Sequence, residues 1–215
     1  MIGVIAYPLG LAVWLSFTDA QVGESGHFTG LGNYQYLLHH GNYADALRNT
    51  AVYTTASTLI KAGLGLLMAL ALARTFPGRR LVYALLFLPF VFPIVIGTVA
   101  WYYLLSNVNG GINYLLVHAH LVNDSVAWLG VGPLPMASLI TVNVWHGTAL
   151  FGVLVLAALR SVPADILDAA VIDGARPLRR FTDVVLPYLS SALALGAVLS
   201  VVGCWSPPSS LAISS

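Results

Sequence analysis

The chain has 215 residues, of which 58% are hydrophobic and only 8% are charged, and its formal net charge at pH 7 is +1. Soluble domains carry about 25% charged residues, so this composition excludes a soluble domain and indicates a protein that crosses a membrane several times. No basic run interleaved with aromatic residues suggests a nucleic-acid partner. The single cysteine, Cys204, excludes an internal disulfide and a cysteine-based metal site.

The first apolar segment, 1–17, is shorter than the roughly 20 residues that a membrane-spanning helix needs. It has no basic region at its start and no clear small-residue cleavage site, so we interpret it as a membrane span and not as a cleavable signal peptide. We expect this span to be shortened at its N-terminal end. Residues 18–45 are polar and rich in glycine, and they predict a loop.

The second predicted span covers residues 49–73. Gly65, Ala69 and Ala73 follow one another at intervals of four, which predicts a face of small side chains that lets another helix approach closely. Lys61 lies near the middle of this span. A charge at that depth is costly, so we expect Lys61 to face the helix bundle or a water-filled cavity, or the span to be shifted along the sequence.

A tight turn over 74–80 leads to the third predicted span, 81–105. Pro89 and Pro93 lie inside this span and predict a kink or a break in the helix. The following segment, 106–133, has an apolar part that is too short to cross a membrane, so we expect an interfacial or loop helix there. Its two histidines are too few ligands for a metal site, and we expect no metal in the chain.

The fourth predicted span, 134–159, carries polar and aromatic residues at its centre: Asn143, Trp145 and His146. Polar groups at membrane depth usually face the bundle or a water-filled path. One interpretation is that these residues line a solute path, with Trp145 offering an aromatic face to a sugar. The other is that they serve hydrogen bonding and packing between helices.

The fifth predicted span is 188–205, and the tail 206–215 has no assignment. Seven of the nine basic residues lie in the turn 74–80 and in the polar stretch 160–187, and the two other long loops contain none. The positive-inside rule therefore places the turn, the stretch and the N-terminus in the cytoplasm. We expect an all-α, polytopic membrane helix bundle with about five spans, forming one domain over 1–205.

The polar stretch 160–187 predicts a helix–turn–helix. Pro163 suits the first turn of a helix of about ten residues, and Gly174 is a natural C-terminal stop. Pro177 can start a second helix, which we expect Pro187 to end. Small alanines on the first helix would fit a groove on a partner protein, although an ordinary loop helix packed on its own bundle would show the same pattern.

The same stretch contains a spaced motif. Asp168-Ala169-Ala170 is followed after three residues by Gly174, and after nine more by Val184-Val185-Leu186-Pro187. This resembles the EAA motif of the membrane subunits of binding-protein-dependent ABC importers, with Asp168 where the family usually has Glu. Leu31-Gly32-Asn33-Tyr34 and the following Ala46-Leu47-Arg48-Asn49-Thr50 are similar to the sugar and glycerol-phosphate branch of those permeases.

The resemblance implies one of two permease subunits of an importer in the cell (inner) membrane of a prokaryote. It implies a carbohydrate or a similar polar solute, a second permease subunit, an extracytoplasmic substrate-binding protein, and cytoplasmic ATP-binding subunits. The chain has no phosphate-binding loop of its own, so ATP would bind a separate ATPase and the chain would be no enzyme. The residues implied to couple to that ATPase are Asp168, Ala169, Ala170, Asp173, Gly174, Leu186 and Pro187.

Members of this family typically have a sixth span, so the resemblance implies a truncated permease, and a non-functional fragment stays an alternative. A secondary transporter that works without an ATPase is another. It would need carboxylates inside the spans, yet every Asp and Glu falls in a predicted loop. An intramembrane enzyme would need a paired acid and base at depth, where only His146 is available.

Overall fold

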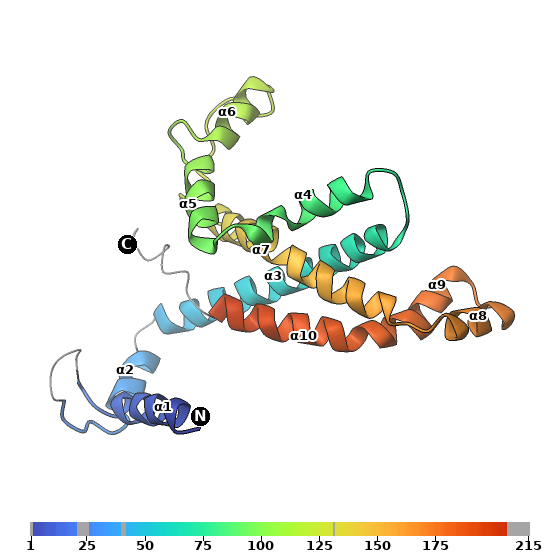
Figure 1. Cartoon of the computed structure of the whole chain (residues 1–215). Helices are drawn as coiled ribbons and strands as arrows, with labels where there is room; N and C mark the ends of the chain where they lie inside the picture. Colours follow the sequence, from blue (N-terminus) through green and yellow to red (C-terminus); the bar gives the residue numbers. More distant parts are fainter. Residues whose placement is uncertain (1, 21–25, 40–41, 131, 206–215) are drawn as a thin grey trace. The chain divides into compact units, whose positions relative to one another are not determined.

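A computed structural model of the chain describes residues 2–20, 26–39, 42–130 and 132–205 (Figure 1). These residues form helices and one isolated antiparallel bridge, between Thr18 and Phe28. The predicted all-α class is therefore confirmed. The helices are α1 (Ile2–Ser16), α2 (Gly32–His39), α3 (Asn42–Ala73), α4 (Arg79–Val91), α5 (Ile94–Leu104), α6 (Gly111–His118), α7 (Leu134–Arg160), α8 (Ala164–Ile172), α9 (Pro177–Arg180), η1 (Phe181–Val185) and α10 (Leu186–Trp205).

The chain divides into two compact units, Met1–Ala51 and Val52–Ser215. In the first unit, the side-chain amide of Asn33 at the start of α2 donates to the backbone oxygens of Ser16 (3.0 Å) and Thr18 (2.8 Å), which ties α2 to the end of α1. The single domain predicted over 1–205 stays a prediction.

The predicted loop over 18–45 is partly wrong, because its described part contains α2. The loop's glycines occur at residue 32 and before, and again at residue 41. The intervening segment 33–39 has neither Gly nor Pro to interrupt a helix. For the same reason α3 begins at Asn42 and not at residue 49. Residues 21–25, 40–41 and the tail 206–215 lie outside the described residues.

Three helical segments in the described part of the chain are long and apolar enough to cross a membrane: Tyr43–Ala73, Leu134–Arg160 and Pro177–Cys204. Helices α4 and α5 add a fourth if they count as one span, although they are bent by 96° at the break between them. The segment Ile5–Ser16 is apolar but shorter. By length and composition, the described residues thus supply up to four spans where the sequence predicted about five.

The predicted break in the third span is confirmed, and it lies at Pro93. Phe92, which ends α4, is extended (φ −71°, ψ 131°). A residue before proline is driven out of the helical region by contact with the proline ring. Pro89 lies inside α4, so only the second of the two prolines interrupts the helix.

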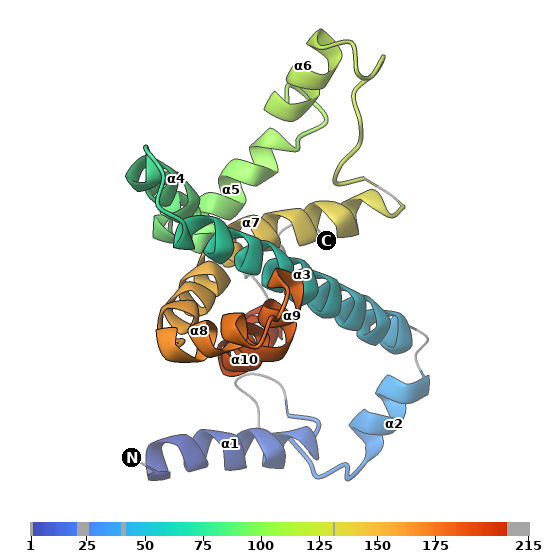
Figure 2. The ribbon, with the colours of Figure 1, turned by 90° about the vertical axis from the view of Figure 1, so that its right-hand side faces the viewer.

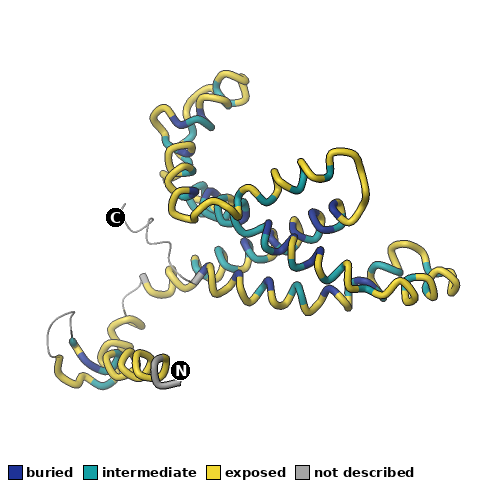
Figure 3. The backbone as a smooth tube through the Cα atoms, in the orientation of Figure 1, coloured by how far each residue is buried: buried dark blue, intermediate teal, exposed yellow. Residues whose placement is uncertain are grey.

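Helices α3, α7 and α10 pack against one another (Figures 1 and 2). Their contact buries a cluster that α4 also touches, and the buried members are Met68, Ala69, Leu72, Val155, Leu156, Val185 and Leu189. Figure 3 shows buried positions where these helices meet and exposed positions over much of their remaining surface. An apolar exposed surface is what a bundle presents to lipid, which is as apolar as its side chains.

The close approach predicted from small residues on α3 is confirmed at two of three positions. Gly65 is buried, and a Cβ atom there would lie 2.5 Å from Cβ of Phe151 on α7. Ala69 is fully buried, whereas Ala73 is exposed and Leu72 takes the buried position. The prediction failed at Ala73 because a row of residues four apart drifts around an α-helix by about 40° at each step.

The expected short helix in 106–133 is α6. Its Asn113 is 3% exposed and joins the two ends of this segment. Its amide nitrogen donates to the backbone oxygens of Ser106 (3.3 Å) and Val126 (3.1 Å). Its amide oxygen accepts from the Val126 N–H (3.1 Å) and from Nε1 of Trp128 (3.0 Å). One buried amide therefore satisfies four hydrogen bonds that fix this loop.

Candidate functional site

Helix α8 forms the tip of the second unit, beyond the ends of α7 and α10 (Figure 1). Leu167 on its inner side packs against the buried cluster. Ile172 on its outer side is 86% exposed. Pro163 caps the N-terminus in an extended conformation, one residue before the helical turn in which it was predicted. The helix is therefore anchored on one face and open on the other.

The predicted stop at Gly174 is confirmed. Gly174 follows the helix in the left-handed conformation, with φ +71°. Its N–H donates to the oxygen of Val171 (3.0 Å), and the N–H of Ala175 donates to the oxygen of Ala170 (3.0 Å). These two bonds are those of a Schellman motif, in which the residue after the helix is usually glycine. A Cβ atom at Gly174 would meet nothing within 4 Å.

The prediction that Pro187 ends a second helix is wrong. Helix α9 begins at Pro177 as predicted, but the chain continues through the π-helical turn η1 into α10 without a break. Proline has no N–H to donate to the oxygen four residues before it, here that of Asp183, and its ring crowds that oxygen. The wider π turn just before Pro187 accommodates both effects, so the span starts inside the polar stretch and not at residue 188.

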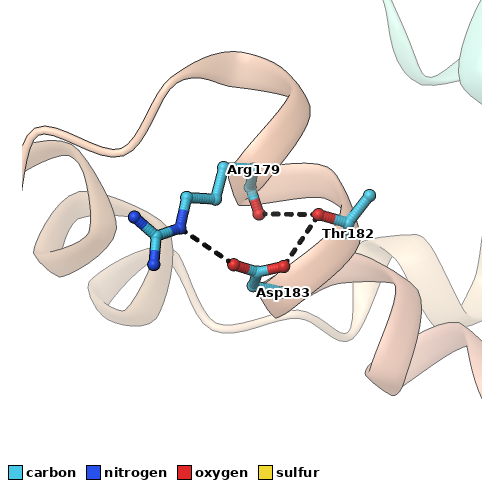
Figure 4. A network of polar contacts seen from close by, with 3 residues as sticks. All are labelled: Arg179, Thr182 and Asp183. Atoms are coloured by element: carbon cyan, nitrogen blue, oxygen red, sulfur yellow. Dashed lines mark hydrogen bonds and ion pairs between the residues drawn. The ribbon is translucent and has the colours of Figure 1, made fainter.

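A small polar network lies on the outside of this turn (Figure 4). Nε of Arg179 donates to Oδ2 of Asp183 (3.1 Å), and the Thr182 hydroxyl donates to Oδ1 of the same carboxylate (2.8 Å). The Arg179 and Asp183 side chains are 77% and 57% exposed. Such exposed pairs contribute little to stability, so this network orders the surface of the turn more than it holds the fold.

The predicted coupling residues form a mostly open surface around α8 and the π turn. The exposed members are Asp168, Ala169, Asp173, Gly174 and Pro187, and the half-buried members are Ala170 and Leu186.

The three predicted solute-path residues, Asn143, Trp145 and His146, line one pocket between α3, α5 and α7. The space in it, including its open mouth, is about 710 Å³. Its other lining residues are Tyr53, Ile94, Gly97, Thr98, Trp101, Tyr102, Leu105, Leu129, Ser138, Leu139 and Val142. An apolar and aromatic wall with a few polar groups is typical of small-molecule sites.

The aromatic wall of the pocket is built across α5 and α7. Trp101 and Trp145 meet edge to face, with ring centroids 5.7 Å apart and an interplanar angle of 72°. A Cβ atom at Gly97 would lie 3.4 Å from Cζ3 of Trp145, so this glycine lets the indole lie close to the α5 backbone. Trp101 and Gly97 were not predicted as site residues, because nothing in the local sequence pairs α5 with α7.

Asn143 both lines the pocket and joins two helices, while its place in a solute path stays a prediction. It lines the pocket, and its Oδ1 accepts a hydrogen bond of 2.7 Å from Nζ of Lys61 on α3. The thiol of Cys204 lies 3.8 Å from the same oxygen and 3.9 Å from Nζ of Lys61. Lys61 is 4% exposed, which confirms that it faces the bundle. Cys204 is therefore part of this polar cluster, a role that the sequence did not indicate. Among the described residues, no group of three or more His, Cys, Asp or Glu side chains could hold a metal ion.

The family described as "Binding-protein-dependent transport system inner membrane component" matches residues 61–207. Among curated relatives, the trehalose transport system permease protein SugA of Mycobacterium tuberculosis is 33% identical over 198 residues, which cover 91% of this chain and 62% of SugA. The probable ABC transporter permease protein y4oQ of Sinorhizobium fredii is 33% identical over 207 residues, covering 94% of this chain and 66% of y4oQ. The chain thus spans less than two thirds of these relatives' length.

A chain in a solved structure has a fold similar to that of this protein. The crystal structure of a bacterial ABC transporter involved in the import of the acidic polysaccharide alginate has a chain that matches with a TM-score of 0.75. The match covers 93% of this chain and 67% of that one, at 21% sequence identity.

Proposed function

The chain belongs to the family of binding-protein-dependent transport system inner membrane components, and from that premise we propose that it is a membrane-spanning permease subunit of an ABC importer. This is a family of transport proteins and not of enzymes. The observation that carries the proposal is that one bundle combines a pocket between α3, α5 and α7 with the exposed helix α8 at its end. In this function, the pocket belongs to the solute path and α8 receives the movement of a separate ATPase.

The surface of α8 supports the coupling role. Ile172 on its outer face is 86% exposed, Val171 at its flank is 52% exposed, and the neighbouring Leu178 is 76% exposed. Apolar side chains on an exposed helix favour docking into a hydrophobic groove. Leu167 on the opposite face holds α8 to the bundle, so a force on the helix reaches the spans. The partner at this face is a cytoplasmic ATP-binding subunit, which supplies the ATP site.

The pocket supports a carbohydrate or a similar polar solute. Trp101 and Trp145 provide flat apolar surface, and Asn143, His146 and Ser138 provide hydrogen-bonding groups. Sugars have both an apolar face and many hydroxyl groups, which this mixture matches. The relative SugA is named for trehalose transport, and further relatives are named for sn-glycerol-3-phosphate transport. An extracytoplasmic binding protein delivers the solute, and a second permease subunit completes the path.

The chain is a membrane protein, in agreement with a family described as inner membrane components and with its long apolar helices. In the orientation we propose, the turn 74–80, the stretch 160–187 and the N-terminus face the cytoplasm. The placement of seven of the nine basic residues in those two segments supports it. The ATPase would then meet α8 on the side where ATP is available.

Two glycines offer a matched test of coupling. Gly174 and Gly78 both have positive φ (+71° and +82°), and a Cβ atom at either would meet nothing within 4 Å. Valine at either position carries a left-handed strain of about 1–2 kcal/mol, but only Gly174 lies at the proposed docking face. In vesicles containing the assembled importer, Gly174→Val should lower solute-stimulated ATP hydrolysis on the order of tenfold, while Gly78→Val should preserve it. Equal activity of the two variants would refute the coupling role of α8.

A further inference from the structure

Among the described residues, no carboxylate forms an ion pair with the buried Lys61 side chain. It is 4% exposed, halfway along the apolar helix α3. In residues 52–215, the acidic side chains are Asp124, in a loop, and four aspartates of the stretch 165–183. The ion pair found among the described residues joins two other side chains, Arg179 and Asp183. Burying an ammonium group is costly unless nearby dipoles or an anion compensate its charge. The groups that contact Nζ of Lys61 therefore decide how this charge is stabilised.

The Lys61 side chain lies against two residues of α7, Asn143 and Gly147. Nζ donates to Oδ1 of Asn143 at 2.7 Å. One helical turn further on, a Cβ atom at Gly147 would lie 2.6 Å from Cδ of Lys61 and 3.4 Å from its Nζ. The absence of a side chain at Gly147 therefore lets the lysine lie across α7 in this position, and a Cβ atom there would make the end of the Lys61 side chain shift. The charge is held immediately behind Asn143, and Asn143 lines the pocket.

This contact fixes the orientation of the Asn143 amide. An ammonium group has only donors, so the amide must turn its oxygen towards Lys61. The thiol of Cys204, 3.8 Å away, approaches the same oxygen. The N–H donors of Asn143 are then left for other partners: the Asn143 side chain also makes a hydrogen bond with the Tyr53 side chain, and both residues line the pocket that a solute would enter. A charge-assisted bond on one side of an amide also strengthens its donors on the other.

The pocket lining contains no Asp or Glu among its residues, so nothing in its wall offsets the positive potential of Lys61. In a site of low dielectric, a cation a few ångströms behind the wall acts strongly on a bound anion. We propose that Lys61 is the specificity-determining residue of this pocket: by orienting Asn143 and placing a cation behind it, Lys61 makes the pocket prefer solutes that carry a carboxylate or phosphate over neutral solutes of the same shape. This inference rests on the proposed role of the pocket in the solute path.

Binding to the chain in lipid nanodiscs tests the preference directly. The probes are glucose, glucuronate and glucose 6-phosphate, which share one ring and differ in charge, and the readout is the fluorescence of the tryptophans. We expect at least one anionic probe to bind on the order of tenfold more tightly than glucose. Lys61→Met should remove that preference, so that glucose and the anionic probes bind with similar affinity, and Lys61→Arg should retain part of it.

Gly147→Ala gives a second test that keeps the charge. Its added Cβ should push Lys61 away from Asn143 and weaken the preference, while Gly63→Ala, whose Cβ would meet nothing within 4 Å, should leave it intact. An anion preference that persists in both Lys61→Met and Gly147→Ala overturns the inference. Equal binding of glucose and both anions by the unchanged chain overturns it as well but leaves the proposed function standing. Binding of none of the three probes overturns both.

Discussion

Gly65 and Gly63 lie two residues apart on α3 and allow the packing between α3 and α7 to be measured. A Cβ atom at Gly65 would lie 2.5 Å from Cβ of Phe151, 3.0 Å from the backbone nitrogen of Gly152 and 3.1 Å from the backbone carbon of Phe151. A Cβ atom at Gly63 would meet nothing within 4 Å. We therefore compare Gly65→Ala with Gly63→Ala.

The two substitutions share one energetic effect and differ in the other. Each replaces glycine by alanine inside a helix, which favours the helix by about 0.8–1.0 kcal/mol. Only Gly65→Ala creates an overlap, and because two of the three nearest atoms belong to the backbone, the helices must move apart. Overpacking of this kind costs about 1–3 kcal/mol. Because the helix-propensity effect cancels, Gly65→Ala should be less stable than Gly63→Ala by about 1–3 kcal/mol.

Reversible unfolding in mixed detergent micelles, followed by circular dichroism and tryptophan fluorescence, measures this difference. Gly63→Ala should be at least as stable as the unchanged chain, and Gly65→Ala should be less stable than Gly63→Ala. A further variant, Gly203→Ala, gives a second control, since its Cβ would also meet nothing within 4 Å. Equal stability of Gly65→Ala and Gly63→Ala would show that α3 and α7 do not pack through Gly65 and would refute the reasoning.

Two further predictions concern the loop after α5 and the turn before α10. Asn113→Ala removes four hydrogen bonds, each worth about 0.5–1.5 kcal/mol. Segment 106–133 should therefore lose local stability, and the Val126 amide should exchange its hydrogen faster. Unchanged hydrogen exchange at Val126 would contradict these bonds of Asn113. Pro187→Ala restores an N–H and removes the crowding that the π turn accommodates. The turn should then become α-helical, which rotates the residues before it by about 100°. The expected result is slower amide exchange over 181–187 together with weaker solute-stimulated ATP hydrolysis, and faster exchange would contradict it.

The features that depend on local composition were predicted correctly. Hydropathy indicated an all-helical membrane protein because lipid demands long apolar helices, and these are present. The stop at Gly174 was predicted because a left-handed residue after a helix is a local demand of the backbone. The break at Pro93 follows for the same kind of reason. The orientation across the membrane stays a prediction.

The features that depend on distant neighbours were missed. Whether Pro187 ends a helix depends on whether the preceding turn can widen. The packing of Val185 and Leu189 in the buried cluster stabilises the continuous helix. The role of Cys204 depends on a lysine 143 positions away in the chain. Trp101 enters the pocket only because α5 lies against α7. No periodicity or motif within a single segment contains this information.

The continuous helix from Pro177 to Cys204 links the surroundings of the pocket to those of α8. At about 1.5 Å per residue, it extends for roughly 40 Å. Near its far end, Oγ of Ser200 lies 2.8 Å from Oγ1 of Thr58, and Cys204 touches the Asn143 cluster. A solute that rearranges Asn143 would therefore change the free energy of the same helix whose beginning, at Leu178, adjoins the proposed docking surface of α8. Linkage is reciprocal: whatever factor the partner at α8 applies to the affinity for solute, the solute must apply to the affinity for that partner.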